Sequence, residues 1–298
     1  MSERPTVRPV TLGRLVELTH ACEHDPQTTD DIETRLDVSR RRARETLLEA
    51  IRLDLVDELE DGDVLRYTTT DIGLEFLNAI REEAWDGVSS LLEAHSPHYH
   101  AFLEVLRDIG PAELELVLAE LTHRESASNR TYNQTSIEIL SDWGERLQAV
   151  QRNAFTGSYY VINDWSAPTA FADELLSVYD DLEQTAGVNL RQRYLSIPKL
   201  REHFCERTGC SRESFDKSLI ELVSQNIGSL ELSGAPIDTG AKDALLGIKS
   251  IALSDSDGLV STTQSTAQIM TGVEQYGKQF YYLAVHERDI TYTPNHNP

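Results

Sequence analysis

The stretch Ser39-Arg40-Arg41-Arg42-Ala43-Arg44 places four arginines within five positions of a chain whose formal net charge is -23. It lies where one short helical pattern ends and a second one begins, with Val38 and Ser39 forming the turn between them. A basic cluster that opposes the charge of the whole protein is not explained by solubility. The stretch therefore indicates a binding site for a polyanion.

The sequence around the arginines predicts a helical domain that ends in a β-hairpin. Apolar residues recur at helical spacing before Pro26, and residues 43, 47, 50 and 51 are expected to face the core of a later helix. Ser39 is a suitable N-cap for that helix. The predicted elements are a helix from residue 11, a short helix capped by Thr28 or Thr29 and running to residue 36, a helix over 40–53, strands at 55–59 and 64–68 around a turn at 61–63, and a helix over 70–83.

This order of elements resembles that of the winged-helix transcriptional regulators of archaea and bacteria. The resemblance rests on Asp30-Asp31-Ile32, on Val38-Ser39-Arg40-Arg41 and on Leu53-Asp54-Leu55-Val56. Thr68-Thr69-Thr70-Asp71-Ile72-Gly73 is also similar to the T-x-x-G joint between wing and helix in that superfamily. The resemblance covers about a quarter of the chain. It implies a DNA-binding domain over residues 11–90, preceded by a flexible arm at residues 1–10.

The composition resembles that of proteins from salt-accumulating halophilic archaea. The chain has 50 acidic and 27 basic residues, and only five of the basic residues are lysines. At molar salt the Debye length falls to about 3 Å, so the net charge does not exclude DNA binding there. Nonspecific attraction to phosphate is then weak, because affinity for DNA falls steeply with salt. The alternative is an ordinary acidic protein that repels nucleic acid.

Two further domains with a similar, degenerate pattern are expected at residues 95–165 and 170–290, followed by a disordered tail at 291–298. Helical spacing that passes into short strands recurs in both segments, without an exact sequence repeat. The predicted fold class is therefore mainly α with small β wings (α+β), arranged as tandem winged helix-turn-helix domains. The predicted helices are 99–109, 111–122, 134–150, 171–186, 197–207 and 212–225, and the predicted strands are 159–162, 228–233, 248–253 and 279–286.

The arginine cluster supplies the main candidate site. A recognition helix presents its N-terminal residues to base edges in the major groove. The planar guanidinium of arginine can bond guanine O6 and N7 together, which contributes about 1–3 kcal/mol of discrimination. The alternative is a solvated helix face whose arginines pair with Glu45 and Glu49. The predicted DNA contacts are Ser39, Arg40, Arg41, Arg42, Arg44 and, on the wing, Arg66, with Arg4 or Arg8 of the arm in a minor groove.

The later domains offer weaker secondary candidates for DNA contact. In the second domain these are Arg130, Asn133 and Gln134, since amide side chains can read adenine. In the third domain they are Arg212 and Lys217. Acidic neighbours in both segments favour a structural or protein-binding role as the alternative.

Motifs for metal binding and catalysis are not evident. His95, His98 and His100 are close in sequence, but a structural zinc site usually needs four ligands at motif spacing. The three cysteines are too few for a disulfide framework and fit a reducing compartment. Walker A, HExxH and G-x-S-x-G patterns are missing. We therefore expect a protein with no metal, no cofactor and no enzymatic activity.

From the sequence we expect a cytoplasmic, sequence-specific double-stranded DNA-binding protein that regulates transcription. It lacks the apolar run of roughly 20 residues that a membrane helix needs. Further partners would be a second copy of the chain, as a homodimer, or other proteins. The alternative is a non-catalytic winged-helix adaptor subunit of a DNA-processing or anti-virus defence complex.

Overall fold

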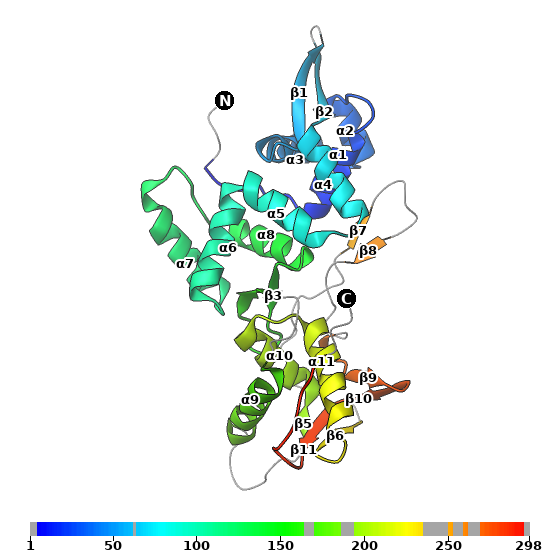
Figure 1. Ribbon diagram of the computed structural model, residues 1–298. Coiled ribbons are helices and arrows are strands. Elements are labelled where there is room, and N and C mark those ends of the chain that lie inside the picture. The colour runs from blue at the N-terminus through cyan, green and yellow to red at the C-terminus, as the bar shows by residue number, and fades with distance from the viewer. Residues whose placement is uncertain are drawn as a thin grey trace. The chain divides into compact units, whose positions relative to one another are not determined.

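The computed structural model describes residues 5–61, 64–163, 170–185, 194–234, 250–252, 259–261 and 269–294. The chain is mainly helical with small antiparallel sheets, so the α+β class predicted from the sequence is confirmed (Figure 1). It divides into two compact units. The first comprises residues 1–150 with 248–263, and the second comprises 151–247 with 264–298. The three predicted domains do not coincide with these units. The predicted domain at 11–90 and most of the one at 95–165 belong to the first unit.

Helices dominate the first compact unit, which also contains one long hairpin. The two short strands β7 and β8 belong to it as well, and β7 lies against α1. The elements are α1 (Leu12–Ala21), α2 (Thr29–Arg35), α3 (Arg40–Arg52), β1 (Val56–Asp61), β2 (Val64–Thr69), α4 (Asp71–Arg81), α5 (Trp85–His95), α6 (Pro97–Ile109), α7 (Leu114–Arg124), η1 (Glu125–Ala127), α8 (Gln134–Arg146), β7 (Ser250–Ala252) and β8 (Leu259–Ser261).

The first three helices form where the apolar spacing predicts, and α2 is also capped as predicted. Thr28 caps α2, since its side chain accepts a hydrogen bond from the backbone of Asp31 and the Asp31 carboxylate accepts one from the backbone of Thr28. In α3, Ala43 and Leu47 are buried against α1 and α2. One face of α3 is therefore fixed in the core, and the opposite face is left to solvent.

The hairpin of β1 and β2 extends beyond the helices of the first compact unit (Figure 1). Its register pairs Val56 with Thr69 and Leu59 with Arg66. The Thr70 hydroxyl then caps α4 by accepting a hydrogen bond from the backbone N–H of Gly73. Helix α4 starts so close to the hairpin that a Cβ atom on Gly73 would lie 2.1 Å from the carbonyl oxygen of Leu55. The glycine of the T-x-x-G pattern is thus needed because the backbone of α4 at Gly73 packs directly against the backbone of Leu55.

Several boundaries in the first compact unit differ from the prediction. Helix α5 was not predicted. Helix α7 begins at Leu114 rather than Pro111, and α8 ends at Arg146 because β3 starts at Val150. The predicted flexible arm is wrong for its described residues 5–10, since Val7 and Val10 are buried.

The second compact unit is built around a three-stranded antiparallel sheet in the order β5-β11-β6. Its core includes the mutually contacting rings of Phe171, Phe204 and Phe215, which come from three different helices. The elements are β3 (Val150–Arg152, which starts at the unit boundary), β4 (Tyr159–Val161), α9 (Phe171–Thr185), β5 (Leu195–Ser196), α10 (Ile197–Thr208), α11 (Arg212–Gln225), β6 (Leu230–Ser233), β9 (Val273–Gln275), β10 (Lys278–Phe280) and β11 (Tyr282–Val285).

The described part of the predicted disordered tail is held in place. The backbone N–H of Thr291 donates to the side chain of Asn226, and that of Thr293 donates to the side chain of Gln225. Both acceptors lie at the C-terminal end of α11. The prediction of a disordered tail from residue 291 is therefore wrong for residues 291–294.

Candidate nucleic-acid interface

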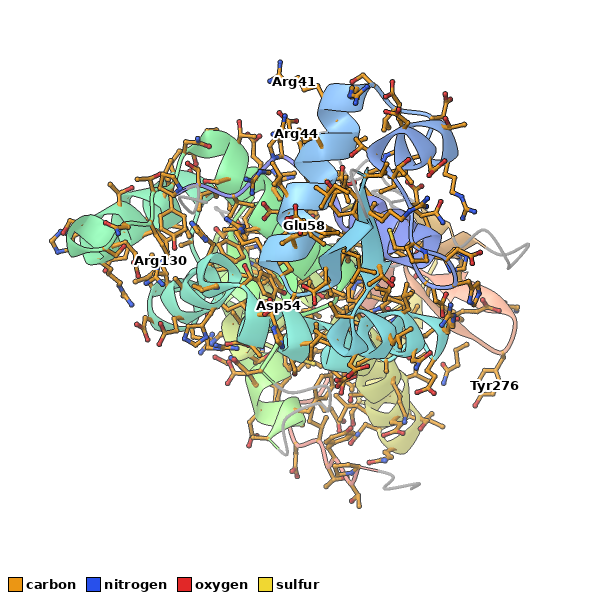
Figure 2. All side chains as sticks on the ribbon, turned by 90° about the horizontal axis from the view of Figure 1, so that it is seen from above. Arg41, Arg44, Asp54, Glu58, Arg130 and Tyr276 are labelled. Carbon is orange, nitrogen blue, oxygen red and sulfur yellow. The ribbon has the colours of Figure 1, made fainter. Side chains whose placement is uncertain are left out.

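The side chains of Arg40, Arg41, Arg42 and Arg44 are all exposed at the beginning of α3. With 3.6 residues per turn, burying Ala43 and Leu47 directs the flanking arginines toward solvent. Arg41 and Arg44 lie on the outer face of the helix (Figure 2). The structure therefore brings together on one exposed surface the four arginines that the sequence singled out.

Two of the four arginines form ion pairs, and both pairs are open to solvent. Arg40 Nη1 lies 3.2 Å from Asp30 Oδ1, and the two side chains are 72% and 73% exposed. Arg41 Nε lies 3.2 Å from Glu45 Oε1, with Arg41 86% exposed. Exposed pairs of this kind contribute only about 0–1 kcal/mol, so a ligand can displace them at little cost.

Arg42 and Arg44 make no side-chain hydrogen bond or ion pair with any described residue. Glu49, one of the carboxylates expected to neutralise the cluster, turns away from it. It is fully buried and pairs with Arg8 and Arg52 instead. Only Glu45 takes part in the internal pairing that was the alternative interpretation of the cluster.

Ser39 occupies the N-cap position of α3 in an extended conformation, but its side chain makes no capping hydrogen bond. The first turn of α3 also contains no acidic residue. The N–H groups at a helix N-terminus carry a partial positive charge and attract anions. The beginning of α3 therefore adds to the positive potential of the arginines.

The hairpin carries the opposite charge. Asp57, Glu58 and Glu60 are exposed on β1. Arg66, the predicted wing contact, is half-buried, and its Nη1 donates to the backbone oxygen of Pro26 at 3.3 Å. Three large apolar side chains of the hairpin are also exposed, namely Leu59, Val64 and Leu65. Four of the five residues from Asp57 to Asp61 are acidic, which was visible in the sequence, but the prediction did not use it.

Arg8 does not extend toward a minor groove as expected. Its Nη1 donates to a carboxylate oxygen of Glu49 and to the carbonyl oxygen of Leu48, both at 3.3 Å. Burial raises the pKa of Glu49, against the lowering effect of Arg52 and Arg8. The buried carboxylate ties residues 5–10 to α3, which corrects the prediction for Arg8. Arg4, the other candidate in the arm, lies outside the described residues.

The secondary candidates near α8 serve mainly local structure. Arg130 donates from Nε and Nη2 to Glu125, at 2.8 Å each. Asn133 caps α8 by accepting a hydrogen bond from the backbone of Ser136 at 2.9 Å. Gln134 is exposed and donates to Glu138 at 3.0 Å. Arg130 and the Oδ1 atom of Asn133 are thus bonded within the protein, which favours the structural alternative for these two residues.

Arg212 is the clearest correction among the secondary candidates. Its side chain is 11% exposed, and it donates to both carboxylate oxygens of Glu202, from Nε at 2.6 Å and from Nη2 at 2.7 Å. Burial alone would lower the pKa of Arg212, but the Glu202 carboxylate raises it above its usual value. The guanidinium is thus a charged structural group whose donors are bonded within the protein, which corrects the expected DNA contact. Lys217, by contrast, is exposed on α11.

The three neighbouring histidines bond to different partners. His95 Nδ1 lies 3.0 Å from Asp54 Oδ2, His98 Nε2 lies 2.9 Å from the carbonyl oxygen of Pro5, and His100 Nδ1 lies 3.2 Å from Glu93 Oε1. Within the described ranges, no group of three or more His, Cys, Asp or Glu side chains could hold a metal ion. All three cysteines are free and buried.

Comparison with known proteins gives no family. No protein-family model matches the chain, and no curated protein matches it. Among solved structures, it is similar to a magnesium ion-bound SspB crystal structure, with 11% sequence identity and a TM-score of 0.39 over 79% of this chain and 81% of that one. None of the helices in the described parts has both the length and the apolar composition required to cross a membrane.

Proposed function

We propose that this chain is a sequence-specific double-stranded DNA-binding protein that regulates transcription in a salt-rich cytoplasm. The observation that carries the proposal is the pair of exposed arginines at the beginning of α3, Arg42 and Arg44, which have no partner among the described residues. Arg40 and Arg41 beside them form only weak, exposed pairs. Short hydrogen bonds from such arginines to base edges would persist at salt concentrations that screen the diffuse attraction to phosphates.

The order of elements supports a tandem winged-helix interpretation. Three helices followed by a hairpin occur first as α1, α2, α3 and β1–β2. Three helices and a two-stranded pairing recur as α6, α7, α8 with β3–β4, and again as α9, α10, α11 with β6–β11. In the first set α3 takes the position of the recognition helix, whose N-terminal residues enter the major groove. Because many functions share this fold, the assignment to transcription follows by analogy.

A second candidate function is that of a protein-binding adaptor, and a specific observation favours it for the later part of the chain. Arg130 and Arg212 are engaged internally, whereas Ile227 and Tyr276 are 87% and 90% exposed. Large apolar side chains left in solvent are common at protein interfaces. In this interpretation only the first domain contacts DNA, and the later ones hold a partner.

Selection from random duplex DNA, titrated with salt and followed by sequencing, tests the proposal. Wild-type protein should enrich a defined motif. Changing Arg40, Arg41, Arg42 and Arg44 to alanine should weaken binding to that motif by at least about 100-fold, since each good base contact contributes about 1–3 kcal/mol. The fold should be unchanged, because all four side chains are exposed.

A matched variant controls for the loss of charge. It replaces four arginines that pair with carboxylates elsewhere on the surface, Arg81, Arg107, Arg124 and Arg207, with alanine. This variant should retain the motif and most of the affinity. Equal enrichment by the wild type and by the α3 variant would refute the assignment of DNA recognition to α3.

A further inference from the structure

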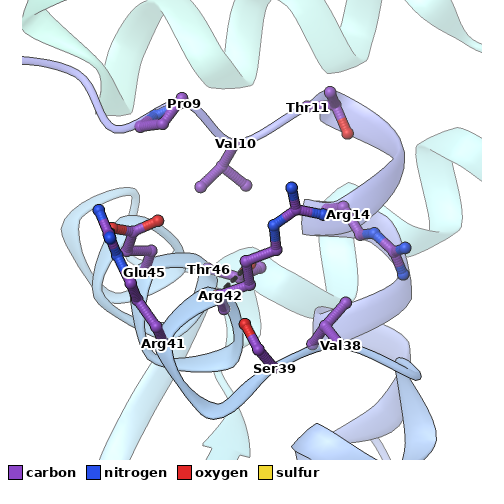
Figure 3. A pocket seen from close by; sticks show the side chains of 10 residues that line it. All are labelled: Pro9, Val10, Thr11, Arg14, Val38, Ser39, Arg41, Arg42, Glu45 and Thr46. Carbon is purple, nitrogen blue, oxygen red and sulfur yellow. Dashed lines mark hydrogen bonds and ion pairs between the residues drawn. The ribbon is translucent and has the colours of Figure 1, made fainter.

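A pocket of about 660 Å³ opens beside the first turns of α3, entirely within the first compact unit (Figure 3). Pro9 and Val10 form one wall, and Arg14 reaches the pocket from α1. Arg41 and Arg42 line it from α3. Its volume lies within the range of about 300–1,000 Å³ that small-molecule sites usually have. Sequence reasoning missed Arg14, because α1 and α3 meet only in the folded chain.

Positive charge predominates in the lining. Arg14, Arg41 and Arg42 face one carboxylate, that of Glu45. Arg42 extends into the middle of the pocket between Val10 and Arg14 (Figure 3), and it has no partner among the described residues. The cavity therefore presents one uncompensated guanidinium directly to whatever enters it.

Two hydrogen bonds hold the side chain of Arg14 in position beside the pocket. Its Nη1 donates to Glu17 at 2.6 Å and to the carbonyl oxygen of Leu36 at 2.9 Å. A guanidinium has five N–H donors, so these two bonds leave others available to a ligand. Two arginines from different helices, Arg14 and Arg42, thus line one cavity, and guanidinium groups bond well to the oxygens of a phosphate group. The apolar side chains of Pro9, Val10 and Val38 provide surface for the body that carries the phosphate.

We propose that this pocket binds a phosphate group, held between Arg14 and Arg42 and contacted by Arg41. The inference deepens the proposed function, because Arg41 and Arg42 belong to the pocket and to the predicted DNA interface alike. A phosphate in the pocket engages arginines that DNA also needs. Its source is either the backbone of bound DNA or a free phosphorylated compound that competes with DNA for the same groups.

Titration with inorganic pyrophosphate in molar KCl, followed by ³¹P NMR, tests the pocket. Wild-type protein should bind pyrophosphate, and R14Q and R42Q should each bind it at least about tenfold more weakly, a difference of about 1.4 kcal/mol. R42Q is needed beside R14Q because Arg14 also bonds to Leu36, whereas Arg42 has no described partner whose loss would disturb the fold. R81Q removes an arginine charge from the same compact unit outside the pocket lining and should bind pyrophosphate as the wild type does.

DNA binding by the same variants identifies the source of the phosphate. If R14Q loses pyrophosphate and DNA together, the pocket holds a backbone phosphate. If R14Q loses pyrophosphate but keeps DNA, the ligand is a free phosphorylated compound, and pyrophosphate should then displace DNA from the wild type. Wild-type protein that does not bind pyrophosphate, or R14Q and R42Q that bind it unchanged, would overturn the pocket assignment. If the DNA proposal alone is wrong, the wild type will select no DNA motif but will still bind pyrophosphate.

Discussion

The E202Q substitution is expected to destabilise the second compact unit by about 3–5 kcal/mol, the usual cost of removing one partner of a buried ion pair. Glu202 is fully buried, and both of its carboxylate oxygens accept hydrogen bonds from Arg212. One oxygen also accepts the backbone N–H of Ala154 at 2.8 Å. A neutral amide would leave the charge of Arg212 buried without a counter-ion, and its NH₂ group would face other donors.

Urea denaturation in molar KCl measures this loss when it is combined with hydrogen exchange in α10 and α11. The matched control is D181N, which removes the charge from another carboxylate that pairs with an arginine in the same compact unit. Asp181 lies 2.9 Å from Arg207 Nη1, and both side chains are open to solvent. The control should cost less than about 1 kcal/mol. Similar losses in the two variants would show that burial of the Glu202–Arg212 pair does not stabilise the unit.

The second large effect is expected at Gly73. Alanine there would place its Cβ 2.1 Å from the carbonyl oxygen of Leu55 and 2.7 Å from Cγ2 of Thr69. Neither the backbone of Leu55 nor the start of α4 can move without disturbing the hairpin and the buried side chains behind it. Overpacking of this kind costs about 1–3 kcal/mol, and contact with backbone rather than a flexible side chain puts Gly73→Ala at about 3 kcal/mol.

Gly13→Ala provides the control. Gly13 lies in α1, and a Cβ atom there would meet nothing within 4 Å. Because alanine restricts the unfolded chain and favours the helix, this variant should be as stable as the wild type or more stable by up to about 1 kcal/mol. Thermal and urea denaturation in the same salt measure the stability of both variants and of the wild type. A Gly73→Ala protein as stable as the wild type would mean that α4 is not pinned to Leu55.

Several local elements could be predicted because short-range rules determine them. Thr28 caps α2 and Thr70 caps α4 as their side-chain chemistry requires, and Ala43 and Leu47 mark the buried face of α3. The exposure of the arginines follows from the same spacing. Helix α11, predicted at 212–225, has those same bounds.

Contacts between distant segments could not be predicted. Arg212 resembled a DNA ligand in the sequence, but Glu202 lies on the preceding helix, and only packing of α10 on α11 brings the two groups together. Arg8 is similar, because its partner Glu49 comes 41 residues later. A pattern of charges along the chain reports which groups are present, but it does not report which of them neutralise each other in the core.

The candidate interface carries charges of opposite sign, with acidic side chains on the hairpin and arginines on α3. For a nucleic acid approaching α3, Asp57, Glu58 and Glu60 repel the strand that the arginines attract. In dilute buffer the repulsion reaches far, whereas at molar potassium it fades within a few ångströms and the close guanidinium bonds remain. Lowering the salt concentration, which usually tightens the binding of proteins to nucleic acid, would for this chain also strengthen the repulsion by the hairpin.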